Sequence, residues 1–246
     1  MGARRKSIEP MDTLEQVVET AFHVFKTDKP TKIGVCENCC MYAKVEADFF
    51  NPDIRDLPDH YLQDWFFAAA DIPLAKNIWA YLLPRVLEML VAGKEPATVG
   101  IEVSLSRFPT GVPDNWNDDQ WRVLDRFHQL FLDRQKTNSD DFLDDIFCMF
   151  GNAGFSNTRS IAIVSAWSDE ELTLKLWQDC CAQGTHGIWG STFWNNGTGQ
   201  DVYDWHRSSA LYERLTNYAL RDDTPPELVQ KASDVTAVIL QGGRWT

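Results

Sequence analysis

The feature that most constrains this chain is a succession of segments in which apolar residues recur at the spacing of an α-helix. In the first segment, Asp12 and Thr13 offer an N-cap, and Glu15 or Gln16 follows at capping-box distance. Its apolar face consists of Leu14, Val17, Val18, Ala21, Phe22 and Phe25. Successive amphipathic helices with short links pack as antiparallel neighbours.

Similar patterns and breaks predict further helices along the chain. Pro84 lies inside one of them and predicts a kink or a split there. The stretch from Val99 to Phe108 alternates like a strand, but also fits a short helix. The predicted helices span residues 13–29, 41–48, 58–70, 71–92, 117–134, 140–150, 157–167, 168–183, 208–220 and 224–240.

We therefore expect an all-α protein built as an antiparallel helical stack. The helix–turn–helix–turn–helix spacing from Phe142 to Cys181 suits a HEAT-like stack, although no period repeats in the sequence. No long linker separates two parts, so the sequence favours a single domain over residues 1–246. A subdivision into residues 10–135 and 140–246 is the alternative.

One segment, from Gly184 to Arg207, departs from the helical pattern. It contains five of the 14 glycines and three of the ten tryptophans. This composition predicts an aromatic, glycine-rich loop or a small β-hairpin inserted between helices. Long loops of this kind often carry function, but their aromatic side chains can also simply pack on neighbouring helices.

Charge narrows the classes of partner. The chain has 23 basic and 36 acidic side chains and a net charge of −13. Binding to nucleic acid, or to an anionic membrane surface, needs a surplus of basic side chains, so neither kind of binding is expected. Residues 138–204 hold ten acids and two bases, which is a net charge of −8 beside the aromatic segment.

Acidic groups steer association and aromatic groups stabilise it, so this region fits a surface for a basic protein. A toxin-immunity protein, which inhibits a basic toxin domain, would use such a surface. A merely solubilising surface is the alternative. The predicted partner-binding residues are Asp140, Asp141, Asp144, Asp145, Trp189, Trp194, Asp201, Tyr203, Asp204 and Trp205.

These aspartates are not equivalent within the predicted helix. Asp140 and Asp141 lie near its N-terminus, where the helix dipole favours a negative charge. Asp144 and Asp145 lie one turn further on, where like charges four residues apart repel.

The cysteines offer one candidate metal site. Cys36, Cys39 and Cys40 form a Cys-x-x-Cys-Cys segment, and two cysteines at this spacing can bind one zinc ion. A complete site needs further ligands, and the sequence contains no second Cys-x-x-Cys. We therefore expect no cofactor, and keep a zinc-binding helical protein as an alternative.

Three segments carry a resemblance to a known family. They are the cysteine segment, the helix start Arg55-Asp56-Leu57-Pro58-Asp59-His60-Tyr61-Leu62, and the helix Tyr81-Leu82-Leu83-Pro84-Arg85-Val86-Leu87-Glu88-Met89-Leu90. Together they resemble a family of uncharacterised bacterial proteins, over residues 20–92 and loosely through 116–134. The resemblance implies a bacterial, soluble, helical protein and carries no activity.

No nucleophile-elbow, phosphate-loop or dinucleotide motif occurs, so the sequence favours a non-enzymatic protein. The enzymatic alternative is a hydrolase with its site near residues 184–207, using His186, His206, Asp201 or Asp204. The basic N-terminus is followed by no apolar run, so we expect no secretory signal and a cytoplasmic location.

Overall fold

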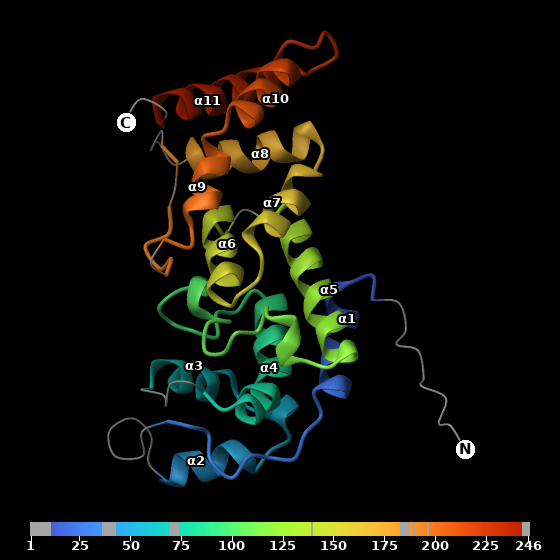
Figure 1. Cartoon of the computed structure of the whole chain (residues 1–246), viewed down its shortest axis with the longest axis vertical. Coiled ribbons are helices and arrows are strands. Elements are labelled where there is room, and N and C mark those ends of the chain that lie inside the picture. Colours follow the sequence, from blue (N-terminus) through green and yellow to red (C-terminus); the bar gives the residue numbers. More distant parts are fainter. Residues whose placement is uncertain are drawn as a thin grey trace, which may run out of the picture. The chain divides into compact units, whose positions relative to one another are not determined.

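The computed structural model describes residues 11–35, 43–68, 74–138, 140–182, 187–188, 190–195 and 197–242. Within these ranges the regular structure is helical and contains no β-strand, which confirms the predicted all-α class (Figure 1). None of the helices described there combines the length and the apolar composition needed to cross a lipid bilayer. Contacts divide the chain into two compact units, residues 1–130 and 131–246.

Unit 1 contains four complete α-helices, most of α5 and three short 3₁₀ turns. The elements are α1 (Leu14–Val24), α2 (Ala43–Phe50), η1 (Ile54–Asp56), α3 (Asp59–Phe67), α4 (Lys76–Val91), η2 (Ile101–Val103), η3 (Pro113–Asn115) and α5 (Asp118–Arg134).

The core of unit 1 is built around α4, which packs on α1 and η1. The fully buried rings of Trp65 and Trp79 stack with 6.1 Å between their centroids. The Trp65 indole N–H donates to the Ile33 carbonyl (2.8 Å), and that of Trp79 donates to the Thr110 hydroxyl (2.9 Å). Both indoles are therefore buried without an unpaired donor.

Unit 2 contains six further α-helices and the end of α5. The helices are α6 (Leu143–Asn152), α7 (Asn157–Ser165), α8 (Asp169–Cys180), α9 (Gln200–His206), α10 (Ser209–Ala219) and α11 (Pro226–Gly242). Helices α10 and α11 pack against each other, and α11 also packs on α8. Leu228 and Ala232 of α11 form a buried cluster there with Tyr218 of α10.

The two capping boxes that the sequence predicts are confirmed. Thr13 and Gln16 form the capping box that starts α1, and Ser168 and Glu171 form the one that starts α8. In each box, the N-cap hydroxyl accepts from a backbone N–H that would otherwise have no partner in the helix.

Helix α4 corrects two predictions. It runs without a break through Pro84, so the predicted split is wrong. Proline inside a helix costs about 3 kcal/mol. Eleven of the sixteen residues of α4 are buried, and burial of a large side chain is worth about 1.5–3 kcal/mol, so burial outweighs that cost. The helix begins at Lys76, later than predicted, because Leu74 is buried in non-helical backbone and Ala75 is extended; residues 71–73 lie outside the described residues.

Two strand-like expectations are also corrected. The stretch from Val99 to Phe108 forms η2 and turns, so the strand alternative is wrong. The described residues from 187 to 199 form turns and irregular backbone, and Val202 and Tyr203 lie in α9 and not in a hairpin strand. Val202 and His206 are both buried, and their spacing of four residues is that of one helix face.

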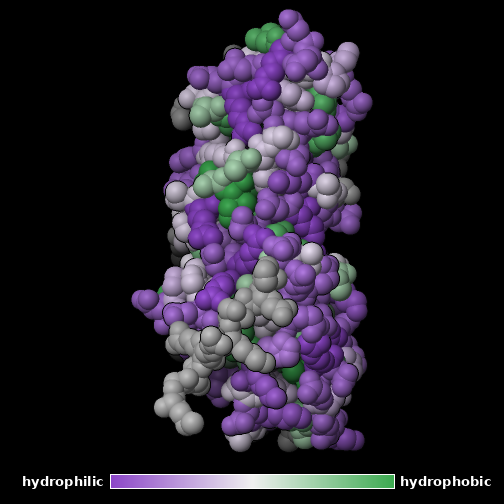
Figure 2. Space-filling model, turned by 90° about the vertical axis from the view of Figure 1, so that its right-hand side faces the viewer, coloured by the Kyte–Doolittle hydropathy of each residue, from purple (hydrophilic) through white to green (hydrophobic). Residues whose placement is uncertain are grey.

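Large exposed hydrophobic side chains are scattered over the described residues. They are Phe67, Val99, Phe193, Tyr203, Leu220 and Leu240. Figure 2 shows one face of the molecule, on which hydrophobic side chains form small, separate groups among hydrophilic ones. Single exposed hydrophobic residues are normal on a folded protein and define no interface by themselves.

Candidate functional site

The predicted acidic residues of the α6 region lie in different environments. Asp140 is exposed and Asp141 is half-buried, and both precede α6. Because α6 begins at Leu143, Asp144 and Asp145 occupy its first turn. The helix dipole favours negative charge there, which corrects the expectation that this second pair lacks a favourable position.

Asp144 is a buried carboxylate that binds another segment of unit 2. Its side chain is only 6% exposed. Its Oδ2 atom accepts from the Ser191 backbone N–H (2.6 Å) and from the Trp194 indole N–H (3.0 Å). Asp144 therefore holds the segment from Gly190 to Asn195 on α6, and this corrects the expectation of a surface charge at this position.

The Trp194 ring, which was predicted to contact a partner, packs on its own chain. It is half-buried, and its atoms lie against Gly151 of α6 and Gly199. A Cβ atom on either glycine would lie 2.5 Å from the indole ring, so both positions need glycine for this packing. For Trp194, the alternative in which aromatic side chains of this segment pack on neighbouring helices is therefore the one that the structure shows.

The side chains of two asparagines hold the same segment through hydrogen bonds to its backbone. Asn152 donates to the Phe193 carbonyl (2.8 Å) and accepts from the Asn195 N–H (3.1 Å). Asn157 donates to the Thr198 carbonyl (2.6 Å). The turns that lead into α9 are therefore held by side chains of α6 and α7.

Trp205 and His206 also pack inside unit 2. The half-buried Trp205 ring meets Phe147 edge to face, with 5.8 Å between centroids. The buried His206 ring donates from Nδ1 to the Val202 carbonyl (2.9 Å). Burial lowers the pKa of His206, and the nearby Asp144 carboxylate only partly opposes this shift. His206 is therefore a neutral packing residue, 6% exposed, and cannot meet a substrate.

The exposed side of α9 carries the remaining predicted residues. Asp201, Tyr203 and Asp204 are exposed; Asp204 lies opposite the buried Val202 and His206, and Asp201 and Tyr203 lie on either side of that buried face. We call these three residues the α9 surface.

Neighbouring side chains hold the α9 surface in place. The Arg207 guanidinium lies over the Tyr203 ring, 5.0 Å from its centroid, and donates to the Tyr203 hydroxyl (3.1 Å). Gln200 donates to Asp204 (2.8 Å). The aromatic ring and one of the two carboxylates are therefore ordered by contacts within α9 and its C-cap.

A buried ion pair, which sequence reasoning missed, removes one acid and one base from the surface of unit 2 and leaves its net charge unchanged. The Lys175 ammonium, 1% exposed, lies 3.0 Å from Asp179 and also donates to the Asp141 carbonyl (2.5 Å). Asp179 accepts from the Leu143 N–H (3.0 Å). Burial raises the pKa of Asp179, and the Lys175 charge opposes that shift. One acid and one of the two bases counted in residues 138–204 are thus structural.

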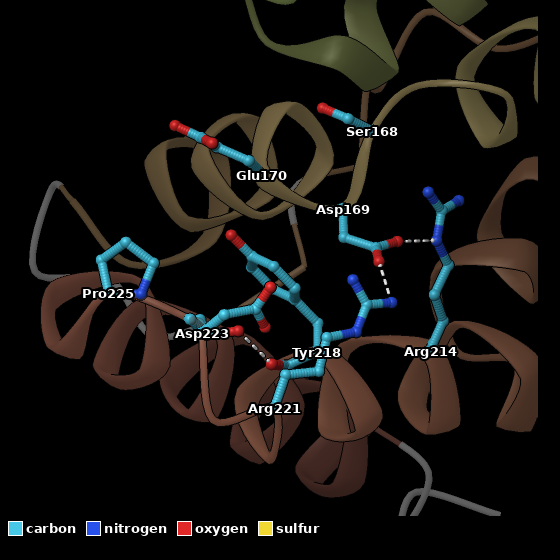
Figure 3. Close-up of a pocket in the computed structure, with 9 residues that line it drawn as sticks. Ser168, Asp169, Glu170, Arg214, Tyr218, Arg221, Asp223 and Pro225 are labelled. Atoms are coloured by element: carbon cyan, nitrogen blue, oxygen red, sulfur yellow. Dashed lines mark hydrogen bonds and ion pairs between the residues drawn. The ribbon is translucent and has the colours of Figure 1, made fainter.

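A polar cavity of about 570 Å³ lies between the N-terminus of α8, the end of α10 and the turn before α11 (Figure 3). We call it the α8–α10 cavity. It is lined by Ser168, Asp169, Glu170, Arg214, Tyr218, Arg221, Asp223, Thr224 and Pro225. Its acidic residues were predicted only to favour the helix N-terminus, and the cavity itself was not predicted.

Asp169 is held in this cavity by two guanidinium groups. Arg214 Nε donates to one carboxylate oxygen (2.7 Å), and Arg221 Nη2 donates to the other (2.5 Å), as Figure 3 shows. Arg214 also donates to the carbonyls of Ser165 (2.7 Å) and Trp167 (2.5 Å). Burial alone would raise the pKa of Asp169, but the hydrogen bonds and charges of both arginines outweigh it, and the pKa is lowered.

Unit 1 contains a second cavity, of about 480 Å³, between α1, η1 and α4. Arg55 lines it, but its guanidinium is paired with Glu19 (2.7 Å) and lies 4.0 Å from the centroid of the Phe22 ring. The buried Tyr81 hydroxyl has no hydrogen-bond partner among the described residues, and it is closed off from solvent. Exposed polar side chains at the end of α1 and just after it also line this cavity, namely His23, Lys26, Thr27, Asp28 and Lys29.

The predicted metal residues Cys36, Cys39 and Cys40 lie outside the described residues, as do Trp189 and His186. Among the residues that the structure does describe, no three His, Cys, Asp or Glu side chains gather as metal ligands would. The zinc hypothesis is tested by elemental analysis of the purified chain. One zinc ion per chain that is lost in a Cys36→Ser variant would establish it.

Comparisons with known protein families, with curated proteins and with solved structures found no match to this chain. The resemblance noted in the sequence therefore stays a prediction.

Proposed function

We propose that this chain is a non-enzymatic, acidic binding module of the bacterial cytoplasm whose partner is a basic protein. The specific form that we propose is an immunity protein for a basic toxin domain, with a HEAT-like stack as its scaffold. The single observation that carries this proposal is the α9 surface, where one short helix exposes two carboxylates and an ordered tyrosine.

The charge of unit 2 supports a basic partner. With Asp144 buried and Asp179 paired with Lys175, the exposed acids of the region include Asp140, Asp201 and Asp204. Exposed carboxylates of one sign raise the rate at which an oppositely charged protein associates, and they disfavour acidic competitors.

The aromatic component gives the surface a place for close contact. Tyr203 is 39% exposed, and its ring is already positioned by Arg207. Tyrosine provides a large contact area with few rotatable bonds, so a pre-positioned ring loses little side-chain entropy on binding.

The attachment of the preceding segment makes this surface rigid. Asp144, Asn152 and Asn157 hold residues 191–195 and Thr198, and Gly199 leads directly into α9. A surface that is ordered before binding avoids part of the entropy cost of association. On this proposal, Asp144 and Trp194 support the binding surface and do not form it.

The experiment compares the wild-type chain with an Asp201→Lys/Asp204→Lys variant as bait in a lysate of the host. We expect the wild type to retain one basic protein and the variant to lose it. A control with the same change in net charge, Glu213→Lys/Asp222→Lys at exposed positions on and just after α10, should keep it. The captured protein is then purified and its affinity measured at low and high salt, because contacts between exposed charges weaken as salt screens them. Equal binding by wild type and variant, or capture that does not change with salt, would show that the α9 surface is not the interface.

A further inference from the structure

The cavity between α1, η1 and α4 in unit 1 has in its wall a residue whose polar atom is left unsatisfied. Tyr81 of α4 lines this cavity and is only 6% exposed, and its hydroxyl has no hydrogen-bond partner among the described residues. Because the hydroxyl is closed off from solvent, bulk water does not replace the missing bond, and the atom costs free energy in the fold. Phenylalanine would fill the same space without that cost, so the hydroxyl is a candidate contact for a ligand.

The walls of this cavity suit a small aromatic compound. They include the rings of Phe22 and Phe25 and the apolar side chains of Ile54 and Pro84. Sites for small molecules are mostly apolar, carry a few placed polar groups and have volumes of the order of the 480 Å³ found here. A ligand ring can pack edge to face against the aromatic side chains of the wall.

Asp53 supplies an acceptor near the Tyr81 hydroxyl. It also lines the cavity, and its charge raises the pKa of Tyr81 beyond the effect of burial, which places the two groups close together. Its Oδ1 atom accepts from the Arg55 backbone N–H (3.1 Å), and its other carboxylate oxygen accepts from no described residue. A hydroxyl is a group that can accept from Tyr81 and donate to Asp53 at the same time.

The charges that line the cavity favour a neutral ligand. The Arg55 guanidinium is neutralised by an acid of α1, and Lys29 donates to two backbone carbonyls (2.5 and 3.1 Å). Lys26 and Asp28 are exposed and form no ion pair with a described residue, so both can move aside as a ligand enters. A cationic ligand would meet the two lysines, and an anionic one would meet Asp28 and Asp53.

We propose that this cavity binds a neutral aromatic compound whose hydroxyl group accepts from the Tyr81 hydroxyl and donates to the Asp53 carboxylate. The ring of the ligand packs on Phe22 and Phe25. The site lies within unit 1 and does not depend on the α9 surface, so either inference can fail while the other holds.

The test is titration of the isotope-labelled full chain with phenol, toluene, benzoate and benzylamine, followed by the NMR shifts of backbone amides. The four probes share one ring and differ in the polar group that they carry. We expect phenol to bind best, with saturating shifts at the amides of Lys26, Arg55 and Tyr81. No saturable shift at about 10 mM phenol, or shifts confined to another part of the chain, would overturn the proposal. Binding of any other probe as tightly as phenol would also overturn it.

Variants tie the binding to the two polar groups. Tyr81→Phe keeps the ring that packs beside Phe50 and removes only the hydroxyl, so it should fold and bind phenol about 5–10-fold more weakly, with no change for toluene. Asp53→Asn keeps an oxygen to accept from the Arg55 N–H and should also weaken phenol binding. The matched control is Tyr61→Phe, which removes a hydroxyl outside the cavity and should bind phenol as the wild type does. Unchanged phenol binding in either cavity variant would overturn the proposal.

Discussion

Replacing Asp144 by alanine tests whether this carboxylate stabilises the fold or serves only to bind a partner. The substitution removes the acceptor of the Ser191 N–H and of the Trp194 indole N–H. Hydrogen bonds to a charged group contribute about 1.5–3 kcal/mol each, so the two bonds together are worth about 3–6 kcal/mol. Relief from burying the carboxylate offsets part of this sum, and we expect unit 2 to lose about 3–4 kcal/mol.

Urea unfolding followed by tryptophan fluorescence measures this loss. With a slope of about 2 kcal/mol per molar urea, the midpoint should fall by about 1.5–2 M. The matched control is Asp201→Ala, which removes an exposed carboxylate from the first turn of α9 and should change stability by no more than about 0.5 kcal/mol. An Asp144→Ala chain as stable as the control would refute the structural role of Asp144.

Three further predictions concern unit 2. Gly151→Ala should lower the Tm although alanine favours helix by about 1 kcal/mol, because its Cβ would lie 2.5 Å from the Trp194 ring. Gly190→Ala, with nothing within 4 Å, should leave the Tm unchanged. His206 stays neutral in the folded chain, whereas in the unfolded chain it takes up a proton below a pH of about 6.5. The free energy of unfolding should therefore fall as the pH decreases. Urea unfolding at several pH values measures this dependence, and His206→Asn should make it weaker. Burial and the Asp234 charge raise the pKa of Cys181 to about 11, so iodoacetamide at pH 8 should label it slowly, as followed by mass spectrometry, and rapid labelling would contradict its burial.

Features that depend on neighbouring residues could be predicted from the sequence. The capping boxes at Thr13 and Ser168 join residues three apart, so the pattern that predicts them is also the structure that forms. The apolar face of α1 is likewise buried at Leu14, Val17, Val18, Ala21 and Phe25. These signals sufficed for the all-α class.

Features that depend on residues distant in the sequence could not be predicted. The sequence predicts a surface charge at Asp144, because its hydrogen-bond donors, Ser191 and Trp194, come nearly fifty residues later in the chain. The seven-residue helix α9 was missed because its buried positions are few and the glycines before it suggest a turn. Nothing in the local pattern distinguishes Lys175, which is fully buried, from a solvated lysine.

The most direct test of the central claim is the rate at which the captured basic protein associates with wild-type and variant chains at low salt. If the α9 surface is the interface, Asp201→Lys/Asp204→Lys should slow association by about tenfold or more, and the control Glu213→Lys/Asp222→Lys, which changes the net charge equally, should slow it much less. The difference should shrink as salt is raised. Equal slowing by the two variants would mean that only the net charge of the chain matters, and would contradict the assignment of binding to the α9 surface.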